Sequence, residues 1–423
     1  MSLSELIDLK NYFKKFAKEG ALVVLTNIIH FSEKLVVVFI LARSLEINEF
    51  GIFGLAITVN SLFSQILFGP FLNGFSRFNP ISYKSEEEKF FLSSASLIWI
   101  KFSLFVTLIL ILLVPFLYLF NKIEFLELFF LVIIYTLLIH TCELIASYYQ
   151  SLRKRIQVFN IRLFELIGKT SFLVLLGTQS VEKVFVYFII TYTIIIFFNL
   201  NLIKRVKFFI NNEKVNYWKL KIIAYIKPFL YWGLFIWIFL NSGKWLLETF
   251  DTTDNVGLYN GIYQIGFTSI LLIGSTINAF LLPILFQKTN ILGSSEIDLK
   301  FWYKRIISLG IIATIFVTFI CYIISEPLVK LILGEKFIGV HILFPYMILS
   351  GALYAMSHVM AGFSYAKNKP QILLNINIMT SVASFFITLT LIYFYSLYGS
   401  VLAMFISTFI YFIIVHFKVK QLL

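Results

Sequence analysis

Long apolar runs, separated by short polar segments, fill almost the whole chain. A helix that crosses the hydrocarbon core of a membrane needs about 20 consecutive apolar residues. The runs therefore predict an all-α integral membrane protein with twelve transmembrane helices. The predicted spans are 21–41, 51–72, 91–116, 125–148, 158–176, 184–203, 223–247, 258–286, 306–325, 341–363, 372–394 and 398–416.

The segment 2–19, which precedes the first run, has a different pattern. Phe13 and Phe16 fall on one side of a helix, whereas Lys15 and Lys18 fall on the other side. A helix with an apolar face and a basic face typically lies in the plane of the membrane surface. We expect this amphipathic helix to lie on the inner surface of the membrane, ahead of the first span.

Basic residues are concentrated at the middle of the chain, in segment 204–221 between two apolar runs. The segment holds six of them, namely Lys204, Arg205, Lys207, Lys214, Lys219 and Lys221. Such clusters are typical of the cytoplasmic loops of membrane proteins. We expect a cytoplasmic hinge at 204–221, joining an N-terminal six-helix lobe, 1–203, to a C-terminal six-helix lobe, 222–423.

The net charge of +13 is distributed unevenly across the predicted topology. When the N-terminus is placed inside, five basic residues fall in the opposite loops, namely Arg43, Lys122, Lys183, Lys330 and Lys336. Basic loop residues otherwise stay on the cytoplasmic side, which the positive-inside rule favours. The pattern predicts a multi-pass membrane protein with both termini in the cytoplasm. It predicts no nucleic-acid partner, because the bases are not gathered on one soluble face.

Composition narrows the functional classes further. Hydrophobic residues make up 59% of the chain and charged residues 13%, so lipid is the solvent that fits. Cys142 and Cys321 both lie inside apolar runs and offer neither a disulfide framework nor a metal-ligand spacing. The sequence has no phosphate-binding loop of the Gly-x-x-x-x-Gly-Lys-Ser/Thr type, and its longest loops are under about twenty residues. We expect no enzymatic activity, no cofactor and no ATP hydrolysis.

The two halves of the chain resemble each other at equivalent places. Glu49-Phe50-Gly51-Ile52-Phe53 opens the second span, and Asn255-Val256-Gly257-Leu258-Tyr259 opens the eighth. Gln157 follows a basic segment before the fifth span, and Gln371 does so before the eleventh. Because six spans is an even number, both copies enter the membrane from the same side. We predict two parallel six-helix repeats around a central cavity.

Three short motifs carry a resemblance to a known family. They are Ala42-Arg43-Ser44-Leu45 with Glu49-Phe50-Gly51; Val256-Gly257-Leu258-Tyr259; and Leu333-Gly334-Glu335-Lys336-Phe337-Ile338-Gly339. With these motifs the sequence resembles the multidrug/oligosaccharidyl-lipid/polysaccharide exporter superfamily, and within it the polysaccharide flippases. It departs from the family pattern in the seventh span. Gly243-Lys244-Trp245 there holds one cation where relatives often carry an Asp-Arg-like pair.

The resemblance implies a flippase of O-antigen, lipopolysaccharide or capsule biosynthesis. Such a protein translocates a polyprenyl-pyrophosphate-linked oligosaccharide across the inner membrane by alternating access. The implied partners are this lipid-linked glycan, membrane lipids, and a glycan polymerase or glycosyltransferases. One alternative is a multidrug extruder of the same superfamily, which would need an acidic cavity for cationic drugs. Another is a membrane glycan polymerase, against which the absence of a large external loop counts.

Charged residues inside the spans are the candidates for substrate binding. A lysine at the centre of a bilayer costs about 2.5–3.5 kcal/mol, so it requires a partner or a wet cavity. Lys34 is the deepest, and either a cationic cavity or an ion pair with another helix explains it. Lys169 joins Lys34 as a cavity candidate, although Glu165 is spaced to pair with it on one helix face. Lys244 and Lys101 are further cavity candidates that could also extend toward the headgroups.

Acidic and amide residues complete the predicted site. Glu33, Glu143 and Glu165 are candidates for ion coupling, and Glu143 follows His140 by one turn, a spacing that suits proton handling better than a metal site. The amides of the second, seventh and eighth spans could bind sugar hydroxyls or link helices. They are Gln65, Asn241, Asn260, Gln264 and Asn278.

Overall fold

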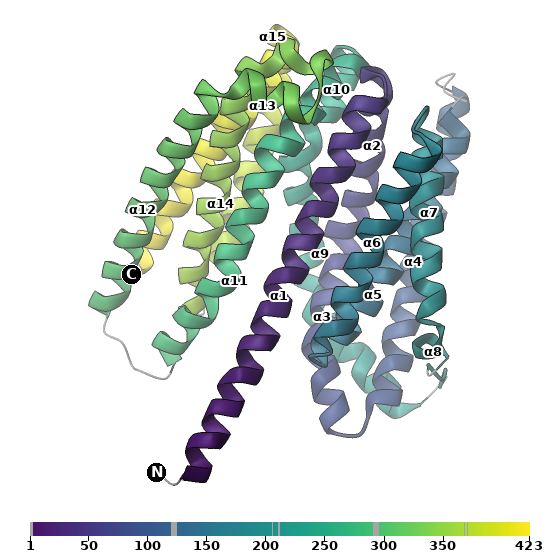
Figure 1. Ribbon diagram of the computed structural model, residues 1–423, viewed down its shortest axis with the longest axis vertical. Helices are drawn as coiled ribbons and strands as arrows, with labels where there is room; N and C mark the ends of the chain where they lie inside the picture. Colours follow the sequence, from purple (N-terminus) through teal and green to yellow (C-terminus); the bar gives the residue numbers. More distant parts are fainter. Residues whose placement is uncertain are drawn as a thin grey trace. The chain divides into compact units, whose positions relative to one another are not determined.

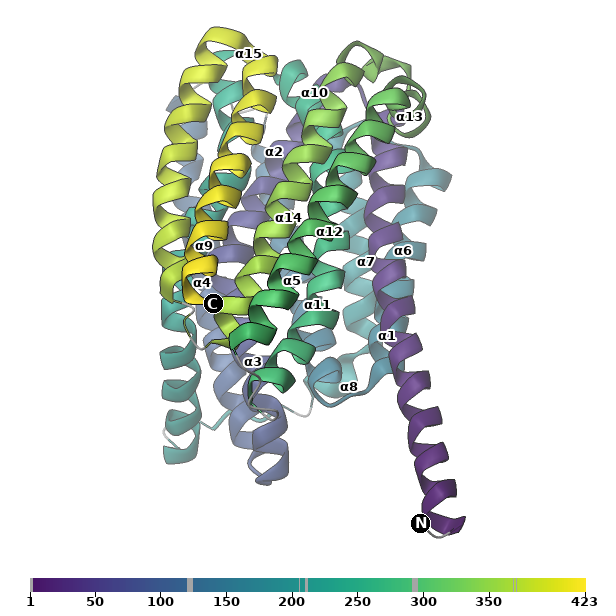
Figure 2. The same cartoon turned by 90° about the vertical axis from the view of Figure 1, so that its left-hand side faces the viewer.

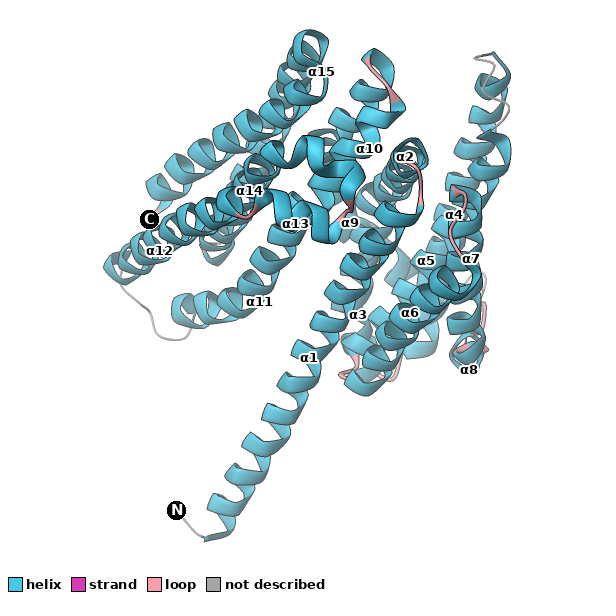
Figure 3. Cartoon of the chain, turned by 45° about the horizontal axis from the view of Figure 1, so that its top comes forward, coloured by secondary structure: helices cyan, strands magenta, loops and turns pink. Residues whose placement is uncertain are grey.

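The computed structural model describes residues 3–119, 125–204, 206–209, 212–290, 296–367, 369 and 371–423 (Figure 1). Within these residues the chain is helical and contains no strand, as the colouring of Figure 3 makes plain. The all-α class is therefore confirmed. The predicted base Lys122 and part of the predicted hinge lie outside the described residues.

The chain forms two compact units, Met1–Ile40 with Val59–Tyr231, called unit 1, and Leu41–Thr58 with Trp232–Leu423, called unit 2. Each of three helices contributes residues to both units. They are α1 (Leu3–Ser44), α2 (Ile47–Phe63) and α9 (Glu213–Phe250). The predicted lobes 1–203 and 222–423 stay a prediction.

Unit 1 is completed by η1 (Ser64–Phe68), α3 (Gly69–Lys84), α4 (Glu88–Leu119), α5 (Leu126–Ser151), α6 (Arg155–Leu176), α7 (Val181–Phe198) and α8 (Leu200–Ile203). Its aromatic core joins α3 and α4 to the first part of α9, where Trp218 packs edge-on against Phe91. Within the predicted hinge, Lys214 forms an ion pair of 2.8 Å with Glu87, which also accepts from the Trp218 indole. Helix α9 begins inside the predicted hinge, and these contacts attach its first part to the rest of unit 1.

Unit 2 contains α10 (Thr253–Ile262), η3 (Tyr263–Thr268), α11 (Ser269–Asn290), α12 (Glu296–Ile323), α13 (Ser325–Ile332), η4 (Glu335–Leu343), α14 (Phe344–Ala366) and α15 (Gln371–Leu422). Figures 1 and 2 show α14 beside α11 and α12, and each of these two helices packs against α14. The start of α2 lies directly on α10, because a Cβ on Gly257 would overlap the Ile47 carbonyl oxygen. Only glycine allows this approach.

Ten helical stretches of the described residues are long and apolar enough to cross a membrane, so the chain is a multi-pass membrane protein. Helix α6, which covers the predicted span 158–176, is not among the ten and carries Arg162, Glu165 and Lys169. Helix α15 covers two predicted spans and breaks at Ser396, whose φ is 52°. Twelve spans and two six-helix repeats stay predictions. One π-helical segment in each predicted half, η1 and η3, agrees with a repeat.

Candidate functional site

Five charged side chains from three helices of unit 1 form a connected cluster, here called the charge network. They are Glu33 on α1, Glu143 on α5, and Arg162, Glu165 and Lys169 on α6. The i, i+3, i+7 spacing of the α6 residues places them on one face of that helix. Glu33, Glu165 and Lys169 are each no more than 4% exposed. Charges this deep require partners, and the structure supplies them.

Arg162 holds the end of the network at α5. Its two terminal nitrogens donate to the two oxygens of the Glu143 carboxylate, each at 2.7 Å, and one of them also donates to Glu165 at 3.0 Å. The paired geometry gives the strong, oriented contact that guanidinium and carboxylate groups make. Glu143 is therefore an ion-pair partner, with His140 one turn before it.

Lys169 holds the end of the network at α1. Its ammonium donates to Glu33 at 2.7 Å and to Glu165 at 3.2 Å, and it lies 4.8 Å from the ring centres of Phe188 and Tyr192. The Tyr192 hydroxyl donates to Glu165 at 2.5 Å. Lys169 is thus buried and neutralised by two carboxylates. The i,i+4 spacing had predicted the pair with Glu165 as the alternative to a cavity role for Lys169.

The network carries one excess negative charge, because it contains three carboxylates and two cations. Glu165 receives hydrogen bonds from Arg162, Lys169 and Tyr192, whereas Glu33 receives one from Lys169. The excess charge is therefore least stabilised at Glu33. A proton or another cation would neutralise the network with the least disturbance at this carboxylate.

Lys34 has a different environment from its neighbour Glu33. Its side chain is exposed, and no ion pair to it occurs among the described residues. Lys101 and Lys227 are also exposed, each again without an ion pair in the described parts of the chain. The ion pair with another helix that was considered for Lys34 is therefore not found among the described residues, and its place in a cationic cavity stays a prediction.

Lys244 in unit 2 is 2% exposed, so its ammonium does not extend toward the headgroups. It donates to the Asn260 side chain at 2.8 Å and lies 4.8 Å from the ring centre of Tyr263, in the π-helical segment η3. Both neighbours are uncharged. Within the described residues Lys244 is a buried cation without a carboxylate beside it.

The other predicted amides have mixed environments. Asn241 is buried and donates to the Trp237 carbonyl at 3.3 Å. This bond lies within one helix, so it links Asn241 neither to a sugar nor to another helix. Gln264 is partly exposed, and Gln65 donates to Ser61 at 3.0 Å. The carbonyl oxygens of Gln65 and Asn278 are buried without a hydrogen-bond partner in the described structure. Asn260 is therefore the amide that the structure connects to a charged candidate.

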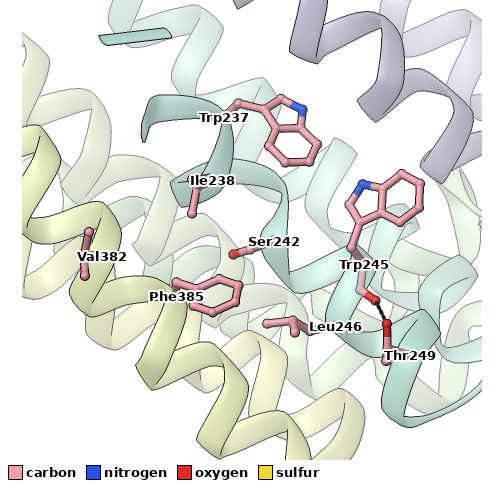
Figure 4. Close-up of a pocket in the computed structure, with 8 residues that line it drawn as sticks. All are labelled: Trp237, Ile238, Ser242, Trp245, Leu246, Thr249, Val382 and Phe385. Atoms are coloured by element: carbon pink, nitrogen blue, oxygen red, sulfur yellow. Dashed lines mark hydrogen bonds between the residues drawn. The ribbon is translucent and has the colours of Figure 1, made fainter. Parts of the chain in front are cut away.

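Two tryptophans of α9 border a pocket of about 320 Å³ in unit 2 (Figure 4). Trp237 and Trp245 donate from their indole nitrogens to the backbone oxygen and the hydroxyl of Thr58, each at 2.8 Å. Phe385 of α15 lies across the pocket, and the buried Ser242 hydroxyl has no partner among the described residues. The pocket suits a flat apolar group with one polar atom.

Sequence reasoning did not include Arg162 among the candidate residues, although it lies within the predicted fifth span, 158–176. Its i, i+3 spacing from Glu165 was a usable signal, because such residues neighbour each other on a helix. The contact of Lys169 with Glu33 had no sequence signal, since α1 and α6 are distant in the chain.

The comparison with solved structures identifies the fold of this chain. No family model matches the sequence, and no curated protein matches it. Among solved structures, a lipid II flippase, MurJ, in an inward closed conformation is 13% identical with a TM-score of 0.68, covering 96% of this chain and 87% of its own. A mutant of the Vibrio cholerae MATE transporter VcmN is 14% identical with a TM-score of 0.62, covering 96% of both chains. An inward-facing multidrug resistance MATE family transporter of the MOP superfamily is 13% identical with a TM-score of 0.60, covering 95% of this chain and 94% of its own. The chain therefore has the fold shared by these transporters and by MurJ.

Proposed function

We propose that this protein is a flippase that moves a polyprenyl-pyrophosphate-linked oligosaccharide, an O-antigen or capsule repeat unit, across the inner membrane. The observation that carries the proposal is the sign of the unpaired charge within the spans. Glu33, Glu143 and Glu165 are all paired with bases. The other carboxylate of the predicted spans, Glu127, is exposed and is only the third residue of its span, 125–148. The span lysines without a carboxylate partner among the described residues are Lys34, Lys101, Lys227 and Lys244.

A pyrophosphate headgroup carries several negative charges, and moving it into a low dielectric is costly unless cations offset the charge. Unpaired lysines supply that compensation, with Lys34 first because it is exposed and lies thirteen residues inside the first predicted span. A neutral hydrogen-bonding group such as the partly exposed amide of Gln264 suits the hydroxyls of a glycan. Fold likeness to a lipid II flippase supports a lipid-linked substrate.

In the proposed cycle, a central cavity between two six-helix lobes opens alternately to each side of the membrane while the lipid tail stays in the bilayer. The charge network of unit 1 gives the cycle a place for a coupling ion, since its excess charge lies at Glu33. A proton or another monovalent cation bound there would neutralise the network. No ATP-binding loop is present in the sequence, so an ion gradient is the proposed source of energy.

The test is glycan export measured beside membrane abundance. Deleting the gene should remove surface glycan and leave lipid-linked repeat units at the inner face. Lys34→Ala should abolish export at normal abundance, and Lys34→Arg should retain part of it, because the charge persists with altered geometry. Lys183→Ala is the matched control, an exposed lysine at the start of α7 that donates to Gln179. Export unchanged in Lys34→Ala would remove the cationic cavity from the proposal.

One observation favours a second candidate, a multidrug extruder. The tryptophan-bordered pocket of unit 2 has the size and aromatic lining of a site for a small apolar molecule, and MATE transporters share the fold. If deletion sensitised cells to lipophilic cations and left surface glycan intact, this candidate would replace the flippase.

A further inference from the structure

Three of the five bases that the charge pattern places on the outer side gather around one pocket of unit 2. Arg43 at the end of α1, Lys330 of α13 and Lys336 of η4 border a pocket of about 750 Å³, and Glu335 is its one acidic border residue. Three cations and one carboxylate give the pocket a net charge of +2. Two of the motifs noted in the sequence thus meet at the same place.

Arg43 and Lys336 are each held by hydrogen bonds to backbone carbonyl groups near the end of another helix. The Arg43 guanidinium donates to the Leu331 carbonyl at 2.5 Å, next to the end of α13, and the Lys336 ammonium donates to the Leu45 carbonyl at 2.7 Å, just after α1. Carbonyl groups fix the positions of the two cations without cancelling their charge. These are therefore oriented charges rather than mobile surface side chains.

Lys330 and Glu335 form the exposed part of the pocket. Their ion pair measures 2.9 Å, and the two side chains are 54% and 78% exposed. Exposed pairs of this kind contribute little to stability, so either member can be changed without unfolding the protein. The backbone between them turns at Gly334, whose φ of 98° favours glycine. A Cβ at Gly334 would approach the Arg43 side chain to 3.4 Å.

The position of the pocket relative to the candidate membrane spans indicates what kind of molecule would reach it. Arg43 is the residue before the end of the candidate span Gly20–Ser44, and Lys336 is the second residue of the candidate span Glu335–Tyr365. Both cations therefore lie near the boundary between hydrocarbon and headgroups. Phosphate groups of lipids lie at this level, and oriented cations bind them through charge-assisted hydrogen bonds.

We propose that the pocket bordered by Arg43, Lys330 and Lys336 binds the phosphate of a lipid. Two lipids offer this chemistry, a prenyl diphosphate, as in the substrate of the proposed function, and an anionic phospholipid of the bilayer. The site itself does not rest on the proposed function, whereas its occupation by the substrate does.

The experiment measures lipid binding to the purified full chain in detergent, with geranylgeranyl diphosphate, geranylgeraniol and phosphatidylglycerol as probes. The diphosphate should bind and the uncharged alcohol should not. Lys330→Gln and Lys336→Gln should each weaken binding about fivefold, because a lysine near a lipid phosphate contributes about 1 kcal/mol. Glu335→Gln should tighten binding by a similar factor, since it raises the pocket charge. Lys183→Gln, an exposed lysine on unit 1, is the control and should bind as the unchanged protein does.

A purely structural role for these cations does not predict tighter binding in Glu335→Gln, so this variant is decisive. If Lys336→Gln lowers thermal stability, Lys330→Gln and Glu335→Gln still test the site. Equal affinities in all variants, or equal binding of alcohol and diphosphate, would overturn the proposal. Competition by phosphatidylglycerol at equal affinity would assign the site to bilayer lipid, and selectivity for the diphosphate would assign it to the substrate. Glycan export is measured separately, so the site can fail while the proposed function stands.

Discussion

The neighbouring residues Glu33 and Lys34 allow a sharp test of the charge network. Lys169 and Glu33 are 2.7 Å apart, with side chains that are each 5% exposed, and Lys169 also neutralises Glu165. Removing one partner of a buried ion pair leaves an uncompensated charge and costs about 3–5 kcal/mol. Lys169→Met should therefore reduce the free energy of unfolding by about 3–5 kcal/mol. Lys34→Met changes an exposed side chain of the same type one residue from Glu33 and should stay within about 0.5 kcal/mol.

The double variant separates lost charge balance from lost packing. Lys169→Met raises the excess negative charge of the network by one, and adding Glu33→Gln restores the original excess. The double variant should therefore be more stable than Lys169→Met alone, with a coupling energy of about 0.5–3 kcal/mol. Unfolding in a denaturing detergent, followed by tryptophan fluorescence, gives the free energies. Equal losses in Lys34→Met and Lys169→Met, or a double variant no more stable than the single one, would refute this account of the network.

Three further outcomes follow from contacts outside the network. Gly257→Ala should lower membrane abundance by forcing a methyl group onto the Ile47 backbone oxygen, whereas Gly20→Ala, with open space around it, should not. Thr58→Val removes the acceptor of one indole hydrogen bond and should cost about 0.5–1.5 kcal/mol in an unfolding titration. The hydrogen bond from Lys214 holds the pKa of Glu87 below its ordinary value. This contact thus stabilises the fold above the ordinary glutamate pKa and is lost as pH falls through the lower folded-state value. Lys214→Gln should raise the Glu87 pKa in an NMR titration with labelled glutamate.

The hydrophobic pattern determined the membrane class and the all-helical fold, because a bilayer requires long apolar helices whose backbone groups bond internally. It also located most spans, because a span is a continuous apolar run that can be recognised without knowledge of tertiary contacts. The spacing of Glu165 and Lys169 predicted their pair for the same reason, because helical neighbours are fixed by local geometry.

Contacts between distant helices could not be derived this way. The sequence ranked Lys34 as the deepest cation, yet the rotation of α1 against α6 decided that its neighbour Glu33 faces Lys169 while Lys34 remains exposed. Lys244 was equally ambiguous, because depth along a helix does not reveal whether a side chain faces lipid or protein. Packing against Asn260 decided that it is buried. Sequence thus predicted which segments form helices and where each charge lies along its helix. Tertiary structure alone decided which charges are neutralised, because a rotation of a helix about its own axis exchanges a buried partner for an exposed face.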